Sequence, residues 1–220
     1  MKKSIFFILF IVLLTSCKKE KTDLFSVVYE VEFISTWSAN THPTDFPANA
    51  HFSPFVAVAH LTGAQLFTVG LNASEGIKEM AETGATNKLE NEITQWLNGS
   101  IAVDKAVGNT FNSPGNSNKV QIGVREGYHT ITAVSMIAPS PDWFVATQTA
   151  LYDAVDGMWY DEVISNVAAY DAGTDSGVTF NSADDTTTPV APINFISIDP
   201  LTEGQDTVVN MGYFKFVRVQ

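Results

Sequence analysis

The chain has 220 residues, of which 45% are hydrophobic and 16% are charged, and its formal net charge is −12. This length and composition predict one globular domain rather than a disordered chain, and the negative charge argues against a nucleic-acid partner and against a polybasic contact with anionic lipid. Cys17 is the only cysteine, so the domain that follows it can contain no internal disulfide and must be stabilised by packing, with or without a metal ion.

Residues 1–16 have the pattern of a signal peptide. Two lysines precede an apolar run, from Ile5 to Leu14, that is too short to span a membrane as a stable helix. The run ends in Leu-Thr-Ser-Cys, which looks like a bacterial lipoprotein signal with Cys17 as the lipid-modified first residue, and 17–23 then form a short lipid-anchored tether. An ordinary secretory signal is the alternative. Either signal predicts export, and the lipoprotein signal predicts a place in the cell envelope, at the outer membrane or cell surface, with membrane contact through the anchor only.

The rest of the chain, 24–220, is predicted to be one mainly β domain. Apolar and polar residues alternate from Phe25 to Trp37, which predicts a half-buried first strand. The proline-rich stretch 38–54 predicts an ordered loop or a broken edge. Short strands are then expected at 55–61 and 66–69.

Two short helices are predicted to interrupt the strands and to cover one end of the sheets. Ser74 looks like the N-cap of the first helix, and Asn87, with Glu90 three residues later, resembles the capping-box start of the second. The second helix has an apolar face that consists of Leu89, Ile93, Trp96 and Leu97. The outward acidic residues are expected to form a solvated face; they are Glu79, Glu82, Glu90 and Glu92.

Strands are predicted again after a loop rich in glycine, asparagine and serine at 108–118. They cover 119–124, 129–137, 143–151, 195–198 and 208–219. Many short strands with turn-rich joints indicate an antiparallel β-sandwich and not a βαβ protein. The polar run 182–188 is expected to be a mobile insertion.

Two turn-rich loops carry carboxylates with little else to pair them. Asp142 lies between a Pro-Ser-Pro turn and a Trp-Phe pair, and Asp171 and Asp175 bracket a glycine in a stretch too poor in apolar residues for a strand or a helix. Three neighbouring aspartates would repel one another unless a cation neutralised them, and calcium takes about six to eight oxygen ligands from such loops. The spacing is not that of an EF-hand, so a site would be assembled from separate loops. The alternative is that these aspartates cap their own backbone.

Five further aspartates receive no ligand role from their spacing. We expect Asp184 and Asp185 to be solvated. Asp153, Asp156 and Asp161 extend the acidic surface without a pattern that indicates a bound ion.

The motifs that usually carry catalysis are missing. The chain has no Gly-x-Ser-x-Gly elbow, cysteine nucleophile, phosphate-binding loop or His-Glu-x-x-His helix. His42, His51 and His60 suggest zinc by residue type, but their spacing has no mechanical meaning across a loop and two strand starts. We expect these imidazoles to form hydrogen bonds with loop backbone and to hold the proline-rich segment in place. The chain is therefore not predicted to be an enzyme.

Three tryptophans, Trp37, Trp143 and Trp159, could form a platform on which a sugar ring stacks. The alternative is burial in the core of the sandwich, which we expect for at least two of them. Trp143 directly follows Asp142, so it is predicted to be an exposed ligand contact at the rim of the metal site.

The sequence also contains a longer series of motifs with a recognisable order and spacing. It begins with Trp37-Ser, His42-Pro, Asp-Phe-Pro at 45–47, His-Phe-Ser-Pro at 51–54, His60, Gly70 and Ala-Ser-Glu-Gly at 73–76, and it ends with Ala-Pro-Ser-Pro-Asp-Trp-Phe at 138–144 and Asp-Ala-Gly-Thr-Asp-Ser-Gly at 171–177. This series resembles the spondin domain of F-spondin and mindin over nearly the whole mature chain. The chain departs from those animal proteins because it has no thrombospondin repeat, no reelin-like region and no disulfide cysteines, so their partner preferences transfer poorly.

The resemblance implies an extracellular, calcium-binding β-sandwich related in shape to C2 domains, with one calcium ion on Asp142, Asp171 and Asp175. Our leading hypothesis is a lipid-anchored adhesion or recognition module that binds a glycan or another surface protein. The first alternative is a metal-assisted hydrolase acting on envelope or extracellular glycans or lipids, which would need a general base beside the metal. The second is a structural envelope component in which the aspartates make only local backbone hydrogen bonds.

Overall fold

The computed structural model describes residues 27–220. The predicted signal peptide at 1–16, Cys17 and the tether at 17–23 lie outside this part. Within residues 27–220, every helix is too short or too polar to cross a membrane. The two sheets are antiparallel and the helices number two, which confirms the predicted mainly β sandwich.

One sheet of the sandwich is built around β1 (Val27–Ser35). In β1 every second side chain is buried, beginning with Val27, so the strand alternates as predicted. β1 pairs on one side with β15 (Gly212–Arg218), and on the other with β7 (Val120–Val124) and β6 (Gly115–Asn116). β12 (Glu162–Asn166) pairs with the outer side of β15 and forms an edge.

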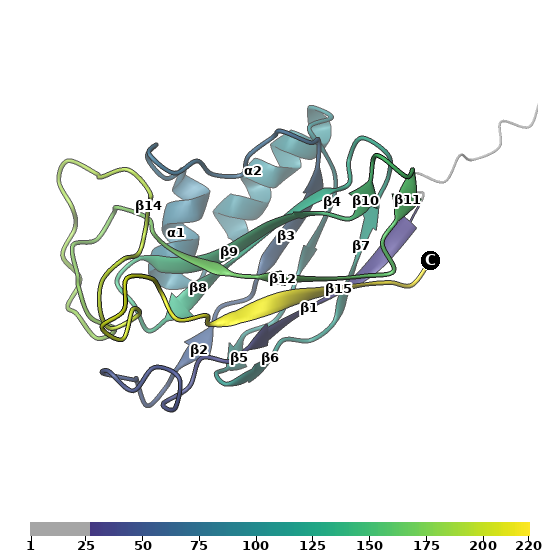
Figure 1. The fold of residues 1–220 in the computed structure, drawn as a ribbon. Coiled ribbons are helices and arrows are strands. Elements are labelled where there is room, and N and C mark those ends of the chain that lie inside the picture. Colours follow the sequence, from purple (N-terminus) through teal and green to yellow (C-terminus); the bar gives the residue numbers. More distant parts are fainter. Residues whose placement is uncertain (1–26) are drawn as a thin grey trace, which may run out of the picture.

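The second sheet has eight strands and is buried on both faces in its middle. Its main path is β14 (Asn194–Phe195), β13 (Ala168–Asp171), β9 (Trp143–Ala150), β8 (Thr130–Ala138), β2 (His51–Phe52) and β5 (Phe111–Asn112), while β3 (Val56–His60) joins β8 to β4 (Ala102–Val107). Every residue of β3 and β8 is buried. A separate hairpin of β10 (Tyr152–Asp153) and β11 (Met158–Trp159) follows β9 at one end of the molecule (Figure 1).

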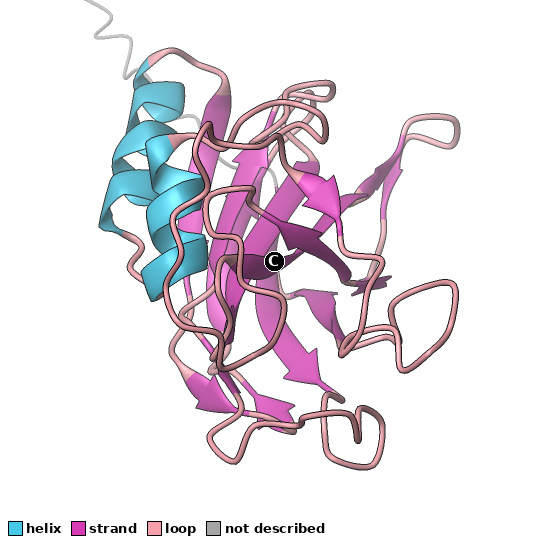
Figure 2. Cartoon of the chain, turned by 90° about the vertical axis from the view of Figure 1, so that its left-hand side faces the viewer, coloured by secondary structure: helices cyan, strands magenta, loops and turns pink. Residues whose placement is uncertain are grey.

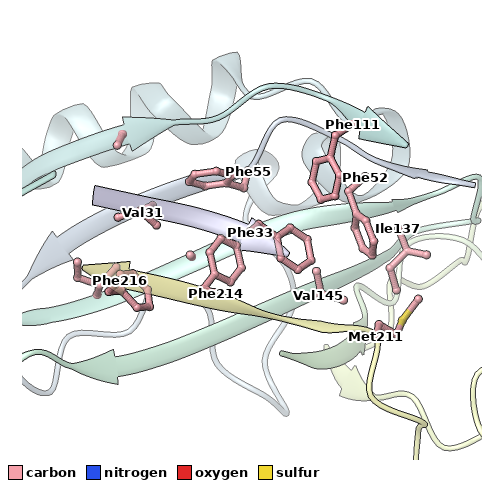
Figure 3. Close-up of a cluster of buried hydrophobic side chains, with 14 of the residues drawn as sticks. Val31, Phe33, Phe52, Phe55, Phe111, Ile137, Val145, Met211, Phe214 and Phe216 are labelled. Carbon is pink, nitrogen blue, oxygen red and sulfur yellow. The ribbon is translucent and has the colours of Figure 1, made fainter. Parts of the chain in front are cut away.

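The space between the two sheets is filled by aliphatic and many aromatic side chains (Figure 3). Phe33 of β1 is central: its ring stacks on Phe214 at 4.6 Å between centroids and meets Phe52 edge-on at 4.7 Å. All three rings are completely buried. Because buried aromatic side chains contribute large apolar areas, this cluster accounts for a domain that needs no disulfide.

The two helices cover the other face of the eight-stranded sheet, where Figure 2 shows them side by side. α1 (Glu75–Thr83) begins at Ser74, whose hydroxyl accepts a hydrogen bond from the Ile77 N–H, as predicted. α2 (Asn87–Asn98) has Thr86 as its N-cap residue, so the predicted cap at Asn87 is wrong by one position.

Several expectations about local structure are wrong for reasons that the packing explains. Residues 66–69 form a loop that packs Leu66 and Phe67 against the helix-side core and do not form a strand. The outward acidic residues are not only solvated: Glu92 accepts a hydrogen bond from the Gly76 N–H at the start of α1, and Glu90 forms an ion pair with Lys105. The strands β4, β12 and β13 were not predicted, nor were the two-residue strands β2, β5, β6, β10 and β11. Asp171, expected to lie outside any strand, is the last residue of β13.

Candidate metal centre

The two acidic turns predicted to meet do lie side by side, because β9 and β13 are paired. Trp143, the first residue of β9, is opposite Asp171, the last residue of β13. Asp142 precedes β9 directly, so its carboxylate lies at the same end of this strand pair as Asp171. The backbone continues the pairing, since the Ala172 N–H donates to the Asp142 carbonyl at 3.1 Å. This end of the sandwich also carries the long loops after β13 (Figure 1).

The turn after β13 depends on a glycine. Asp171 Oδ1 accepts a hydrogen bond from the Gly173 N–H at 2.7 Å, which closes the turn. Gly173 has a φ of 75°, and a Cβ atom there would lie 2.1 Å from the Ala191 carbonyl oxygen. The Ala191 N–H in turn donates to the Gly173 carbonyl at 2.9 Å. A residue with a side chain would therefore push the two segments apart.

The Asp142 carboxylate is completely buried and its two oxygens differ. Oδ2 accepts hydrogen bonds from the Thr174 N–H at 2.6 Å, the Thr174 hydroxyl at 3.2 Å and the Asp175 N–H at 3.1 Å. Oδ1 is also buried and has no hydrogen-bond partner among the residues described. Because a buried carboxylate oxygen without a donor is strongly disfavoured, Oδ1 is the atom of this junction that could accept a further partner.

Asp175 connects the turn to a segment further along the chain. Its Oδ1 accepts from the Gly177 N–H and its Oδ2 from the Asp185 N–H, both at 2.8 Å. The Ser176 hydroxyl donates to the Asp185 carboxylate at 2.6 Å. The run 182–188, expected to be a mobile insertion, is thus fastened to the acidic turn by direct hydrogen bonds. Sequence reasoning missed Asp185 and Thr174, whose roles depend on this tertiary path.

Burial and neighbouring negative charge raise the pKa values of Asp142 and Asp171. Burial, followed by the negative charge of Asp171, raises the pKa of Asp142 to about 6 even though the hydrogen bonds from Thr174 and Asp175 act in the opposite direction. Burial also raises the pKa of Asp171; hydrogen bonds from Gly173 and the Trp143 side chain lower it, and the charge of Asp175 raises it. No ion pair in residues 27–220 involves any of the three aspartates. Negative charge is therefore concentrated here without a positive side chain.

The donor set fits a hard cation such as calcium in part. Across residues 27–220, no three aspartate, glutamate, histidine or cysteine side chains form a group that could hold a metal ion on their own. Calcium, however, takes many of its ligands from backbone carbonyls and water. The fit rests on Asp142 Oδ1, which is the buried carboxylate oxygen left without a donor in this part of the chain.

The prediction that Trp143 is an exposed ligand contact is wrong. Its side chain is 1% exposed and packs against Phe180, with ring centroids 5.6 Å apart. Trp37 is also completely buried, which confirms that at least two of the three tryptophans belong to the core. Trp143 points inward because it lies on the same side of β9 as Val145, which faces the other sheet.

The three histidines of the upstream series are used in hydrogen bonds with the backbone, as predicted. The His42 ring links the proline-rich loop to the Val209 carbonyl at 3.1 Å, and the rings of His51 and His60 contact carbonyls within two residues of themselves. Burial lowers the pKa of both His42 and His60. Both imidazoles therefore favour the neutral form, which suits a structural role.

Comparison with known proteins agrees with the resemblance that the sequence motifs indicate. The family described as Spondin_N matches residues 27–206. The chain is 34% identical over 170 residues to Spondin-1 of Gallus gallus and 33% identical to Spondin-1 of Homo sapiens, in each case covering 73% of the chain and 21% of the relative. Spondin-2 of Homo sapiens is 28% identical over 170 residues, which cover 73% of the chain and 50% of that protein. The chain thus spans about a fifth to a half of the length of these relatives.

Proposed function

Because the chain belongs to the Spondin_N family, we propose that it is an exported adhesion or recognition module that binds a glycan or a protein outside the cytoplasm. The matching segment includes nearly all of the sandwich and both acidic turns. The relatives are much longer than this chain, so the proposal concerns the shared domain and not the activities of those whole proteins.

The module binds one calcium ion at the junction of the two acidic turns. Asp142 supplies Oδ1, and Asp171 and Asp175 supply negative charge and further oxygen atoms from the adjoining turn. The observation that supports this assignment is the buried Oδ1 of Asp142 with no donor, beside Asp171, in a cluster without an ion-pair partner in residues 27–220; the pKa values of Asp142 and Asp171 are both raised. Calcium would neutralise this cluster and leave coordination positions for a carboxylate or hydroxyl group of the partner.

The chain's own residues prepare the junction for such an ion. The Thr174 and Asp175 N–H groups hold Asp142 Oδ2 and so orient the carboxylate with Oδ1 directed away from them. The β9–β13 pairing sets the separation of the two turns. Few groups would have to be ordered when the ion binds, and preorganisation of this kind favours affinity.

Calcium titration of the purified protein tests the proposal. We expect the melting temperature to rise with calcium, since an ion present at 100 times its Kd stabilises the native state by about 2.7 kcal/mol. Asp142→Asn keeps an oxygen for the Thr174 N–H but removes the charge, and it should abolish the rise. Asp156→Asn removes the same charge from the exposed β10–β11 hairpin and should leave the rise intact. A wild-type protein that neither binds calcium by calorimetry nor melts later in its presence would refute the calcium site.

The membrane attachment rests on Cys17 and is tested separately. Cells grown with a labelled fatty acid should incorporate the label into the wild-type chain and not into Cys17→Ala, and only the wild-type chain should remain with the membrane fraction. Ser16→Ala is a matched control one position away. Secretion of the unlabelled wild-type chain into the medium would instead indicate an ordinary secretory signal and leave the calcium proposal untouched.

A further inference from the structure

An exposed aromatic side chain lies at the edge of the eight-stranded sheet. Phe195 belongs to the two-residue strand β14 and is 56% exposed. β14 lies beside the long loops, at the end of the molecule opposite the β10–β11 hairpin (Figure 1). The Phe195 ring packs on Tyr170 of the neighbouring strand β13, with centroids 4.8 Å apart. One face of a small aromatic stack is thus open to solvent.

Two hollows adjoin this ring, and Phe195 lines both of them. The first, of about 370 Å³, lies on the side of the sheet that carries the 61–73 loop, with Phe67 in its wall. The second, of about 470 Å³, lies between residues 166–169 and 206–211. Both volumes fall in the range typical of small-molecule sites.

The first hollow exists because the sheet has small side chains at this point. Ala146 of β9 is paired with Ala168 of β13, whereas the pair two positions along, on the same face of the sheet, is Phe144 with Tyr170. The step from a large aromatic ring to the methyl group of Ala146 along this face of β9 leaves room beside Tyr170. Ala146 and Tyr170 both line this hollow.

The polar groups around the first hollow are uncharged, and some of their hydrogen-bonding capacity is unused within residues 27–220. Gln65 accepts a hydrogen bond from the Thr68 hydroxyl at 2.9 Å, which fixes the orientation of its amide and leaves its N–H groups free to donate. The Gln148 amide and the Tyr170 hydroxyl form no hydrogen bond with any residue between 27 and 220. Amides and hydroxyls both donate and accept, so these groups match ligands that carry many hydroxyl groups.

The charge of the lining residues narrows the class of ligand. Neither hollow is lined by a lysine, arginine or histidine of the described chain, and Asp206 in the second hollow is the single carboxylate. Together with the net charge of −12, this lining disfavours phosphate, sulfate and uronic acid groups. Aromatic faces bordered by neutral amides and hydroxyls suit the apolar face and the hydroxyl edge of an uncharged sugar ring.

We propose that an uncharged oligosaccharide binds across Phe195, with one ring stacked on the phenyl face and the adjacent rings in the two hollows. This proposal names the ligand class for the recognition function proposed above and rests on it. The site is distinct from the calcium junction but adjacent to it, because Asp171 is paired with Asn194 and Tyr170 with Phe195 in the same two strands.

A glycan array probed with the full-length mature protein tests the ligand class. We expect signals for uncharged oligosaccharides and none that depend on sulfate or uronic acid groups. A soluble uncharged hexasaccharide from the positive class, such as cellohexaose, maltohexaose or chitohexaose, is then titrated by calorimetry. Signals restricted to anionic glycans, or binding of apolar peptides with no binding of any sugar, would overturn the proposal.

Substitutions at Phe195 test the place of binding. Phe195→Ala should weaken binding about tenfold or more, and Phe195→Trp should retain it. Ile198→Ala is the matched control, since Ile198 is 47% exposed in the same segment and lines neither hollow. Equal affinity of Phe195→Ala and wild type, with unchanged melting temperatures, would show that the sugar binds elsewhere and overturn this site.

Each titration is run in calcium and in chelator, so the two proposals can fail separately. Sugar binding in both conditions by a protein that does not respond to calcium would leave the sugar site standing and refute the calcium site. Calcium binding without any sugar or glycan binding would refute the sugar site alone. Loss of sugar binding in Gln148→Ala would place the first hollow, and not only Phe195, in the contact.

Discussion

Aspartates cluster at both ends of β9, but the pKa of Asp142 at one end is raised and that of Asp153 at the other end is lowered. At the β9–β13 junction, Asp142 is completely buried, and burial together with Asp171 raises its pKa to about 6. In the β10–β11 hairpin, Asp153 is only partly buried, and hydrogen bonds from the Val155 and Asp156 N–H groups lower its pKa. Both carboxylates accept hydrogen bonds from backbone N–H groups, but at Asp142 burial and the charge of Asp171 outweigh these bonds, whereas at Asp153 the bonds outweigh burial.

The comparison shows that a count of carboxylates does not identify a cation site. The hairpin region also has three aspartates within a few residues, and one of them, Asp161, already has a cationic partner in Arg218. Solvation and pairing leave that cluster with no need for an ion. At the junction, Asp142 is buried and has no cationic partner in residues 27–220, so burial is the property that separates the two clusters and the ground on which we propose an ion there.

The largest expected effect comes from a pair of glycine substitutions, one in each region. Gly173→Ala should lower the free energy of unfolding by about 3 to 4 kcal/mol, because φ is positive and the new Cβ would meet the Ala191 carbonyl. Gly157→Ala in the hairpin also has a positive φ, but its nearest neighbour is the Tyr152 hydroxyl at 3.6 Å. Gly157→Ala should therefore lower the free energy of unfolding by only about 1 to 2 kcal/mol, from the backbone strain alone.

Urea denaturation of both variants measures this difference. Equal losses in Gly173→Ala and Gly157→Ala would show that the junction is as adaptable as the hairpin. In that case the close packing of 173 against 191 would not be what holds the acidic turn in place.

The second prediction concerns pH in the absence of calcium. The pKa of Asp142 is raised in the folded protein from 3.8 to about 6, so the folded state binds its proton more tightly than the unfolded chain does. The stability that this carboxyl contributes is fully present below pH about 3.8 and is lost as the pH rises through about 6. A shift of this size corresponds to about 3 kcal/mol. In chelator, wild type should therefore lose up to this amount relative to Asp142→Asn between pH 4 and pH 7.5.

The same comparison in the hairpin provides the control. The stability of Asp156→Asn should change with pH in the same way as that of wild type over this range, because Asp156 is exposed in the tip of the hairpin. Saturating calcium should remove the loss in wild type, since the ion favours the ionised carboxylate. A wild-type curve parallel to that of Asp142→Asn in chelator would contradict the buried charge.

The parts of the fold that the sequence predicted are those in which one local pattern decides. β1 alternates strictly from Val27, and Ser74 caps α1, so both were predicted correctly. β4 was not predicted because Asp104 and Lys105 interrupt its apolar pattern. Tertiary contacts satisfy both charges: Asp104 accepts from the Gly123 N–H of β7 at 2.7 Å, and Lys105 pairs with Glu90 of α2.

The same distinction between local sequence patterns and tertiary contacts applies to the candidate metal site. The motif spacing predicted that Asp142 and the turn with Asp171 belong together, and the β9–β13 pairing brings them side by side. The alternation around Trp143 could not reveal which face of β9 is internal, so its burial was missed. The unpartnered oxygen of Asp142 was also beyond prediction, because it depends on how Thr174 and the chain around it fold over the carboxylate.

The smallest expected effect concerns the ion pair that distinguishes the hairpin region from the junction. The side chains of Asp161 and Arg218 are 85% and 38% exposed, so water screens their attraction, and exposed pairs contribute about 0.2 to 1 kcal/mol. A double-mutant cycle with Asp161→Asn and Arg218→Gln should give a coupling in this range that shrinks as salt is added. The backbone hydrogen bond from the Arg218 N–H to the Asp161 carbonyl remains in every variant, so the cycle isolates the charges. A coupling above about 2 kcal/mol that persists in high salt would mean that the hairpin charges are as poorly solvated as Asp142, and the contrast between the two regions would then no longer hold.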